Sequence, residues 1–434
     1  MPDRPNVLVV FTDQQRADTL GCHGNPMDLT PNLDAAADRG TRAEQAITPQ
    51  PVCGPARACL QTGRHGTEHG VFTNGRVLDP TETTIAECFA DAGYDTGYVG
   101  KWHLANARLD PVPEDLRAGY DHWRAAGALE WTSHPYEGRL YDEDGDPIEF
   151  DGYRVDALTD LAEEFLRQDR EDPFFCFLSY LEPHHQNDMD TYAAPDGYAT
   201  RYDDPWVPPD LEGRPGDWQA ELADYYGICR RIDECYGRLQ SVLEEEGLAE
   251  DTIVVFASDH GSHFRTRTPE YKRSCHDASV HVPLVFDGPG FEGGDVVEEP
   301  VSLLDLPPTL LDAAGLDVPA PMTGESLVDA ADGGPERDDV FVQISEREVG
   351  RALRTDRWTY SVFDPDADPG RDPASDRYVE RYLYDNHADT GQEVNLAGRW
   401  DYADVAERLR ERLADRIEAV EGERPTIEPA RHYP

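Results

Sequence analysis

The stretch NVLVVFTD, residues 6–13, decides the fold class of this chain. A short continuous run of apolar, β-branched and aromatic residues is typical of a strand buried on both faces of a parallel sheet. Further runs of this character predict strands at DTGYVG (95–100), PFFCFLSYL (173–181), TIVVFAS (252–258) and VPLVFDG (282–288). The intervals between these runs are long enough for helices that connect parallel neighbours.

Helical patterns fill those intervals. The segment TPNLDAAADRG (30–40) has Thr at the N-cap, Pro at the first helical position and a Gly stop. Apolar periodicity predicts further helices over residues 84–93, 153–168, 217–247 and 304–315. Strands that alternate with helices imply right-handed crossovers. We therefore expect an α/β fold with a large mostly parallel sheet sandwiched by helices.

The chain changes character after about residue 320. Residues 329–339, DAADGGPERDD, have the composition of a linker. Strand-like segments follow at 339–346, 357–363 and 381–386, and a helix is predicted over 401–422. This order predicts a smaller C-terminal α+β subdomain with an antiparallel sheet. We place the larger domain at residues 1–330 and the subdomain at 331–434.

The charge balance is strongly acidic: 88 Asp and Glu face 39 Lys and Arg, for a net charge of −49. The acidic residues are spread along the chain, which indicates a folded protein with a carboxylate-coated surface rather than an acidic tail. Such self-repulsion is tolerated where salt screens it, so we expect the cytoplasm of a high-salt organism. The charge argues against nucleic acid or an anionic membrane as a partner.

The N-terminus supports the same placement. It enters an apolar run almost at once, without the basic stretch and small-residue cleavage site of a secretory signal. The chain has no apolar run of 18 residues, so no membrane span is expected. The eight cysteines include no C-x-x-C pair, which argues against a zinc ribbon or a thioredoxin-like motif.

Lysine usage singles out two positions. Only Lys101, in GKWHL, and Lys272, in YKRSCHD, are lysines; the other basic residues are arginines. Lysine is a compact point charge that arginine does not reproduce. A chain that uses arginine everywhere else therefore has a reason to keep these two, although two surface lysines retained by chance are the plainer alternative.

Polar side chains follow the predicted strands at the point where each strand ends. Asp13, Lys101, His184 and Asp259 each come after an apolar run. In open α/β sheets, ligands bind outside the carboxyl ends of the strands. Four separate segments therefore deliver polar groups to one edge of the sheet, which is the main indication of an active site.

The residue types at that edge indicate a metal and an anion pocket. Asp13, Gln14, Asp259 and His260 offer oxygen and imidazole ligands that suit Ca²⁺, Mg²⁺ or Mn²⁺. For any one of these aspartates, a helix cap is an alternative role. A second group is cationic or can become so and would bind a compact tetrahedral oxyanion: Arg57, Lys101, His103, His184 and Lys272.

Cys53 opens the segment CGPARACLQTGR, residues 53–64. Pro55 fits the first turn of a helix, which puts Cys53 at the helix N-terminus, where the dipole favours an anionic group. An ordinary cysteine nucleophile needs a thiolate and a general base. It has no need of the Cys-x-Pro-x-Arg pattern.

That pattern resembles the signature of the formylglycine-dependent (type I) sulfatases, which belong to the alkaline phosphatase superfamily. GKWHL (100–104), DHG (259–261), HVPLVF (281–286) and LYDNHADTGQEVNL (383–396) are similar to the same family, in the expected order. The resemblance implies an alkaline-phosphatase-like fold. It also implies that a formylglycine-generating enzyme oxidises Cys53 to the aldehyde formylglycine during maturation.

The resemblance further implies a mechanism. The hydrated aldehyde is a geminal diol, of which one hydroxyl attacks sulfur and expels the alcohol. Deprotonation of the other hydroxyl eliminates sulfate and regenerates the aldehyde. The implied ligands of one divalent cation, with Ca²⁺ favoured over Mg²⁺ or Mn²⁺, are Asp13, Gln14, Cys53 as formylglycine, Asp259 and His260. Arg57 would hold the diol, His103 would be the base, and the sulfate would contact Lys101, His184 and Lys272.

Some positions depart from the family pattern. Gln14 and His260 stand where many sulfatases carry Asp and Asn, and these variants resemble the choline-sulfatase and phosphonate monoester hydrolase branches. Lys101 and His103, in contrast, resemble the true sulfatases. The usual Tyr-Glu after the second lysine reads His276-Asp277 here. These two residues are expected either to contact the substrate or to hydrogen-bond behind the site.

The leading functional hypothesis is hydrolysis of a sulfate monoester, from a small molecule or a carbohydrate, to an alcohol and inorganic sulfate. A phosphonate monoester or phosphodiester hydrolase on the same scaffold is the alternative. A non-catalytic binding protein that retains the fold is a third hypothesis, of another class. We expect the substrate pocket to be shaped by Trp131, His134, Tyr136 and the loop 186–206.

Overall fold

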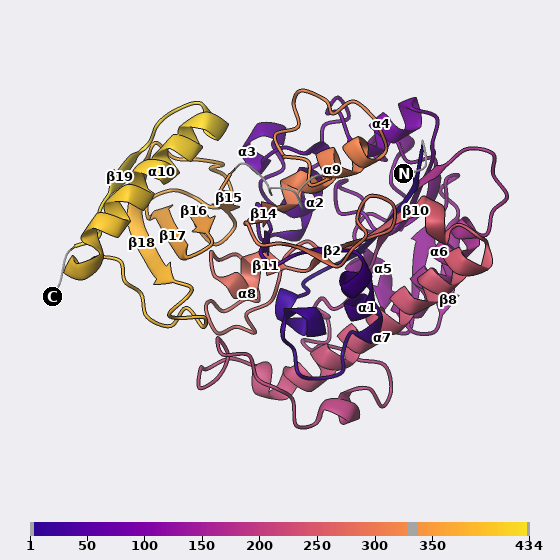
Figure 1. Cartoon of the computed structure of the whole chain (residues 1–434), viewed down its shortest axis with the longest axis horizontal. Helices are drawn as coiled ribbons and strands as arrows, with labels where there is room; N and C mark the ends of the chain where they lie inside the picture. The colour runs from indigo at the N-terminus through magenta and orange to yellow at the C-terminus, as the bar shows by residue number, and fades with distance from the viewer. Residues whose placement is uncertain (1–3, 329–336, 432–434) are drawn as a thin grey trace.

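The computed structural model describes residues 4–328 and 337–431. A large body of sheet and helices carries a smaller C-terminal subdomain on one side, drawn in orange and yellow (Figure 1). The boundary expected between residues 330 and 331 lies outside the described residues. Among the described residues, no helix has the length and apolar character that a membrane crossing requires.

The core of the large sheet is parallel, as the sequence predicts. Strand β1 (Asn6–Thr12) lies between β9 (Phe174–Ser179) and β10 (Thr252–Ser258), and both run parallel to it. Strand β4 (Asp95–Lys101) continues the parallel set beside β9, and β5 (His122–Ala126) follows β4. These strands are the continuous apolar runs of the sequence, because a central parallel strand is buried on both faces.

Antiparallel pairs flank this parallel core on both sides. Strand β12 (Leu284–Asp287) pairs antiparallel with β10, and β7 (Glu137–Tyr141) pairs antiparallel with β5. The remaining strands of the eleven-stranded sheet are β2 (Thr41–Ala43), β6 (Ser133–His134), β8 (Pro147–Asp151) and β13 (Asp295–Val297). A separate small sheet contains β3 (Ala46–Ile47), β11 (His281–Val282) and β14 (Val301–Ser302).

Alternate residues of β1 enter two different cores. Val7 and Val9 belong to the apolar cluster on one face of the sheet, whereas Leu8 and Val10 belong to the cluster on the other face. The two-residue period of a strand produces this division. Helices cover both faces (Figure 1). On one face are α2 (Cys53–Thr62), α4 (Ile85–Asp91) and α9 (Leu306–Ala313); on the other are α1 (Pro31–Arg39), α6 (Arg154–Leu166) and α7 (Trp218–Glu245).

The C-terminal subdomain contains a five-stranded sheet. Its strands are β15 (Asp339–Ile344), β16 (Val349–Thr355), β17 (Trp358–Asp364), β18 (Arg377–Asp385) and β19 (Thr426–Glu428). The first four pair antiparallel in chain order, and β19 pairs parallel with β18. The predicted helix is α10 (Ala403–Glu421), which packs its apolar face on this sheet. The short helices of the chain are α3 (Gly66–His69), α5 (Leu129–Thr132) and α8 (Asp277–Val280).

The subdomain docks next to the segment that precedes Cys53. The backbone N–H of Gln343 donates to the carbonyl of Pro49 over 2.8 Å. The side chain of Gln50 donates to Ser345 Oγ, also over 2.8 Å. Hydrogen bonds between buried groups on both sides fix the loop that leads into α2. The subdomain thereby supports the position of Cys53.

The acidic surface predicts a dependence of stability on salt. Acidic side chains such as Asp172, Glu212 and Glu250 are exposed, and the chain carries a net charge of −49. Raising KCl from about 0.1 M to about 1 M shortens the Debye length from about 10 Å to about 3 Å and weakens their mutual repulsion. We expect the thermal unfolding midpoint to rise by about 5 °C or more in a calorimetric scan.

A neutral solute separates screening from general exclusion of solute from the surface. Sucrose at matched osmolality is the control, because it stabilises compact states without screening charge. A midpoint that is unchanged or lower in KCl, or equal gains in KCl and sucrose, would contradict the prediction.

Candidate active site

The carboxyl ends of four parallel segments meet at one edge of the sheet. Asp13 follows β1, Lys101 is the last residue of β4, and Asp259 follows β10. His184 lies in the loop that follows β9. Cys53 is the first residue of α2 and is buried at the same edge. The structure therefore brings together the polar groups that the strand ends were expected to deliver.

Four of the expected metal ligands form one compact cluster. A ligand atom from each of Asp13, Cys53, Asp259 and His260 lies within 4.8 Å of the others, and all four residues are buried. Cys53 Sγ is 3.2 Å from His260 Nε2 and 3.5 Å from Asp13 Oδ1. Two carboxylates so close together in a buried site repel each other unless a cation lies between or beside them.

Gln14 completes this cluster. Its Nε2 donates to the hydroxyl of Tyr192 over 2.6 Å, while its buried Oε1 accepts no hydrogen bond from any described residue. Buried acceptors are normally satisfied, so an orphaned amide oxygen beside two carboxylates fits the ligand set of a hard divalent cation. The residues present therefore fit the expected metal.

The backbone is strained where two of these strands end. Gln14 has a φ of 71° and His103 a φ of 66°, in the left-handed region that such residues rarely adopt. Conformations of this kind cost about 1–3 kcal/mol each and persist only where neighbours hold them. Gln14 N donates to Asp259 Oδ1 over 3.0 Å, and His103 N donates to the carbonyl of Gly127 over 2.8 Å.

Arg57 lies beneath the cluster and connects its parts. Its guanidinium donates to Asp13 Oδ2 over 3.0 Å and lies 3.4 Å from Asp259 Oδ2. Its other terminal nitrogen donates to Ser179 Oγ over 2.6 Å and to the carbonyl of Lys101 over 3.0 Å. The rigid fork of an arginine suits several acceptors at once. This side chain is buried and holds the ends of β1, β4, β9 and β10 together.

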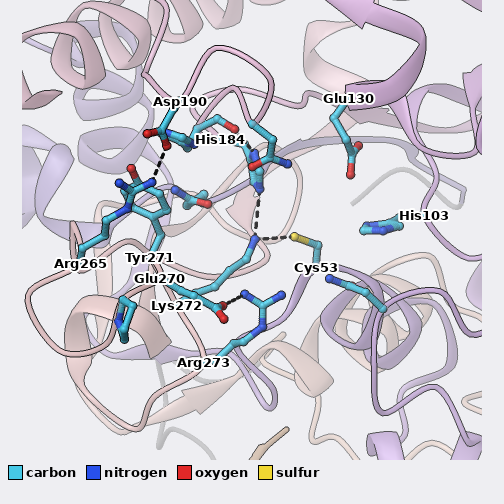
Figure 2. A pocket seen from close by; sticks show the side chains of 15 residues that line it. Cys53, His103, Glu130, His184, Asp190, Arg265, Glu270, Tyr271, Lys272 and Arg273 are labelled. Carbon is cyan, nitrogen blue, oxygen red and sulfur yellow. Dashed lines mark hydrogen bonds and ion pairs between the residues drawn. The ribbon is translucent and has the colours of Figure 1, made fainter. Parts of the chain in front are cut away.

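The two lysines of the chain both reach the site. Lys101 is fully buried, and its Nζ donates to Asp13 Oδ2 over 2.8 Å. Lys272 Nζ donates to Cys53 Sγ over 2.9 Å and to His184 Nε2 over 3.2 Å (Figure 2). Their retention in a chain of arginines therefore has a structural reason, because each ammonium lies in the narrow space around Cys53.

The surroundings of Cys53 favour a negative charge there. Burial raises the pKa of its thiol, but Lys272, Lys101 and His260 outweigh burial and hold the pKa well below the ordinary value. Burial and Lys272 lower the pKa of His184 to about 4, so its ring is neutral at pH 7. A position that stabilises a thiolate also stabilises other anions that develop at the same place.

A cavity of about 350 Å³ opens above Cys53. Four of the other expected site residues line it: Gln14, His103, His184 and Lys272. Figure 2 shows side chains from several segments that converge on it. Its other lining residues are Asn74, Glu130, His185, Asn187, Asp190, Arg265, Pro269, Glu270, Tyr271 and Arg273. Asn187 and Asp190 belong to the loop 186–206, as expected, whereas Trp131, His134 and Tyr136 are not among the lining residues.

Sequence reasoning missed several of these lining residues. Glu130 lies on the one-turn helix α5, which is too short to show a periodic pattern of apolar residues. Arg273 is directly next to Lys272 and pairs with Glu346 over 2.5 Å and with Glu270. Glu346 belongs to the C-terminal subdomain, so the position of Arg273 depends on a contact that only the folded chain reveals.

His276 is not among the residues that line the cavity. Its Nε2 lies 3.2 Å from the hydroxyl of Tyr384 and its Nδ1 lies 3.1 Å from Ser274 Oγ. The neighbouring Asp277 accepts from Arg354 Nε over 3.0 Å. These contacts favour the second of the two expectations for this pair, in which both residues hydrogen-bond behind the site and connect it to the C-terminal subdomain. Nothing in the described contacts supports the substrate-binding role expected of His276.

The sequence model of the sulfatase family matches residues 5–316. The chain belongs to the sulfatase family. The model of the C-terminal part of N-sulphoglucosamine sulphohydrolase matches residues 270–419 of this sulfatase. Membership of the family places the chain in the alkaline phosphatase superfamily and makes it a sulfuric ester hydrolase.

Curated relatives cover nearly the whole chain. An ulvan-active sulfatase of Formosa agariphila is 31% identical over 96% of this chain and 81% of its own length. An N-acetylglucosamine-6-O-sulfatase of Bacteroides thetaiotaomicron is 24% identical over 95% of this chain and 86% of its own length.

Solved structures confirm the fold. A putative sulfatase, yidJ, of Bacteroides fragilis superposes with a TM-score of 0.84 at 24% identity, over 97% of each chain. The phosphonate monoester hydrolase of Agrobacterium radiobacter shares the fold with a TM-score of 0.71 at 24% identity, over 95% of each chain.

The buried position of Arg57 predicts a large effect on stability. Arg57→Ala leaves the carboxylates of Asp13 and Asp259 without this partner in a buried site, and breaking such a pair costs about 3–5 kcal/mol. We expect a loss of that size in the free energy of unfolding, measured by urea denaturation in the presence of a chelator.

The matched control removes an exposed arginine that also pairs with two carboxylates. Arg167 contacts Glu245 and Glu246 at the surface, and exposed pairs contribute little. Arg167→Ala is expected to leave the denaturation midpoint nearly unchanged. If the two variants were equally stable, the buried cluster would not have the structural importance assigned to it.

Proposed function

We propose that this sulfatase hydrolyses a sulfate monoester with formylglycine, formed from Cys53, and a bound divalent cation. The observation that carries the proposal is the position of Cys53 Sγ. It lies 2.9 Å from Lys272 Nζ and 3.2 Å from His260 Nε2, in the floor of the cavity. A group at this position faces both a metal ligand set and a cation that can hold a sulfate oxygen.

The metal would be held by Asp13, Gln14, Asp259 and His260, with residue 53 completing the set. Conversion of Cys53 to formylglycine replaces the soft sulfur by oxygen, which leaves oxygen and imidazole donors that suit Ca²⁺, Mg²⁺ or Mn²⁺; the resemblance to the sulfatase family favours Ca²⁺ among them. When bound, the cation supplies positive charge that lowers the pKa of a hydroxyl on residue 53. Formylglycine, when formed, supplies a hydrated aldehyde as the nucleophile and a way to release sulfate.

The chain's own cations bind and orient the ester. Lys101 and Lys272 contact the cluster at Asp13 and Cys53 respectively, and both ammonium groups can donate to sulfate oxygens. Arg57 already donates toward Asp13 and lies below residue 53, where it can hold an oxygen of the hydrated aldehyde. These charges are fixed before the substrate arrives, so they stabilise the transition state without reorganisation.

Lys272, oriented by His184, and His103 are suited to proton transfer. His184 Nδ1 lies 2.6 Å from the carbonyl of His185, which assigns the ring proton to Nδ1 and leaves Nε2 facing Lys272. A proton from Lys272 is therefore available to the leaving alcohol oxygen. His103 lines the cavity, and its buried Nδ1 has no partner among the described residues. This nitrogen can accept a proton when sulfate is released from residue 53.

The substrate is inferred to be a carbohydrate sulfate. The relatives named for ulvan and for N-acetylglucosamine support a sugar ester. Activity requires maturation by a formylglycine-generating enzyme in the host.

We also propose, from the net charge of −49, that the enzyme works in the cytoplasm of a high-salt organism. A purely binding protein would have no use for the strained and charged arrangement around Cys53.

A matched pair of esters tests the proposal. Phenyl sulfate and phenyl phenylphosphonate share the phenolate leaving group and differ in the group that is transferred. We expect mature enzyme to hydrolyse the sulfate with at least about 100-fold higher kcat/KM, because the two lysines hold a compact sulfate. Colorimetric detection of phenol measures both reactions.

Lys101→Ala provides the internal check. Removing one charged donor in the site should lower kcat/KM for the sulfate by about 100-fold or more. If mature wild-type enzyme hydrolysed the phosphonate faster than the sulfate, the result would instead support the phosphonate monoester or phosphodiester hydrolase alternative.

A further inference from the structure

Glu130 is one of three carboxylates that line the cavity; the other two, Asp190 and Glu270, pair with Arg265 and Arg273. Glu130 lines the cavity with Cys53, His103 and His184, and its side chain is 11% exposed. Figure 2 shows Glu130 and His103 to one side of Cys53 and Lys272 to the other. A negative charge at this point opposes the binding of an anionic ester. Its presence therefore needs a reason.

Glu130 forms a long ion pair with Lys101, which leaves its hydrogen-bonding capacity unused. Glu130 Oε2 is 3.4 Å from Lys101 Nζ, whereas Asp13 Oδ2 accepts from the same nitrogen over 2.8 Å. Lys101 thus has a closer partner of its own. Glu130 Oε2 is buried and accepts no hydrogen bond from any described residue. Lys101 stabilises the charge, but the lone pairs of Oε2 remain available to accept a hydrogen bond from a ligand.

The charge state of Glu130 determines which ligand group can satisfy it. Burial raises the pKa of this carboxyl, but Lys101, His103 and His184 outweigh burial and lower it to about 2. The group is therefore an ionised carboxylate at neutral pH. An ionised carboxylate accepts hydrogen bonds and donates none. It attracts a hydroxyl or an amide N–H of the substrate and repels a second sulfate or a carboxylate.

The position of Glu130 puts this hydrogen-bond acceptor close to an ester bound at residue 53. Glu130 and Cys53 line the same cavity, and Lys101 Nζ lies 3.4 Å from Glu130 Oε2 and 2.8 Å from Asp13 Oδ2 of the cluster around Cys53, so Glu130 is among the groups that surround an ester bound at residue 53. A sugar sulfate carries hydroxyl groups that can donate to this carboxylate, whereas phenyl sulfate has none.

We propose that Glu130 is a specificity-determining residue that accepts a hydrogen bond from a hydroxyl group on the carbon next to the sulfate ester. It thereby makes the enzyme select hydroxylated sugar sulfates over esters that lack such a donor. This inference rests on the proposed function, since it names the class of ester that the same site takes.

The test compares substrates that differ in this donor. The sugar substrate is the best-hydrolysed member of a set of glucose and galactose monosulfates; phenyl sulfate has no neighbouring hydroxyl. Wild-type enzyme, Glu130→Gln and Glu130→Ala are prepared with equal conversion of Cys53, and release of inorganic sulfate is measured by ion chromatography. We expect both variants to lower kcat/KM for the sugar sulfate by about 10- to 100-fold and to change that for phenyl sulfate by less than about 3-fold.

A deoxy substrate and a surface variant sharpen the comparison. The analogue of the sugar sulfate in which the neighbouring hydroxyl is replaced by hydrogen should be insensitive to both Glu130 variants. Glu137, an exposed carboxylate on β7, lies outside the set of lining residues. Glu137→Gln should leave the ratio of the two kcat/KM values at the wild-type level.

A binding measurement does not depend on turnover. In a Cys53→Ala background, calorimetric titration with the sugar sulfate should show about 10-fold weaker affinity when Glu130→Gln is added. The affinity for inorganic sulfate should not weaken, because inorganic sulfate presents no such hydroxyl.

The outcomes separate this inference from the proposed function. Equal losses on the sugar and phenyl esters would overturn it, because Glu130 would then act only through Lys101. Unchanged kinetics and unchanged binding in both variants would also overturn it. Wild-type enzyme that cleaves phenyl sulfate but no sugar sulfate would refute the sugar selectivity alone. Wild-type enzyme that cleaves no sulfate ester would refute the proposed function itself.

Discussion

The rest of the site depends on the buried ion cluster of Arg57, Lys101 and Asp13. Both cations donate to Asp13 Oδ2, Arg57 over 3.0 Å and Lys101 over 2.8 Å. Such a cluster is stable only when every member is paired, because desolvated charges are expensive. The pairing fixes the ends of β1 and β4 relative to the first turn of α2. It also leaves Asp13 Oδ1 directed at Cys53 and His260. A position for the nucleophile and a ligand set for a cation therefore follow from one electrostatic constraint.

The parallel sheet is what allows so few contacts to build the site. Polar residues at successive strand ends converge without any adjustment by long loops. The remaining components come from the loops after β9 and β10. These loops bring His184 and Lys272 into contact with each other beside Cys53. The C-terminal subdomain then holds the Lys272 loop in place through the pair between Arg273 and Glu346. It contributes support rather than chemistry to the described site.

Residues with strong local signals could be predicted from sequence. The central strands were readable because burial on both faces requires a continuous apolar run, and the strand-end residues followed from that reading. Strand β16 was not predicted, because two arginines interrupt its pattern. In the fold, Arg351 pairs with Glu421 and Arg354 with Asp277, so each buried arginine has a carboxylate partner. The position of Glu130 in the cavity could not be predicted, and two roles stayed open for His276, because the direction of a side chain in a short helix or loop depends on tertiary contacts. The conversion of Cys53 to formylglycine was expected only from the family resemblance, because no rule of residue spacing predicts it.

The central claim is that residue 53 acts as formylglycine. The most direct measurement is the mass of the tryptic peptide of residues 43–57, taken from enzyme produced with a formylglycine-generating enzyme and shown to release sulfate. The account predicts that sulfur and two hydrogens are exchanged for one oxygen, in a fraction of molecules that rises in proportion to the specific activity. A fully active preparation in which Cys53 retains its thiol would contradict it.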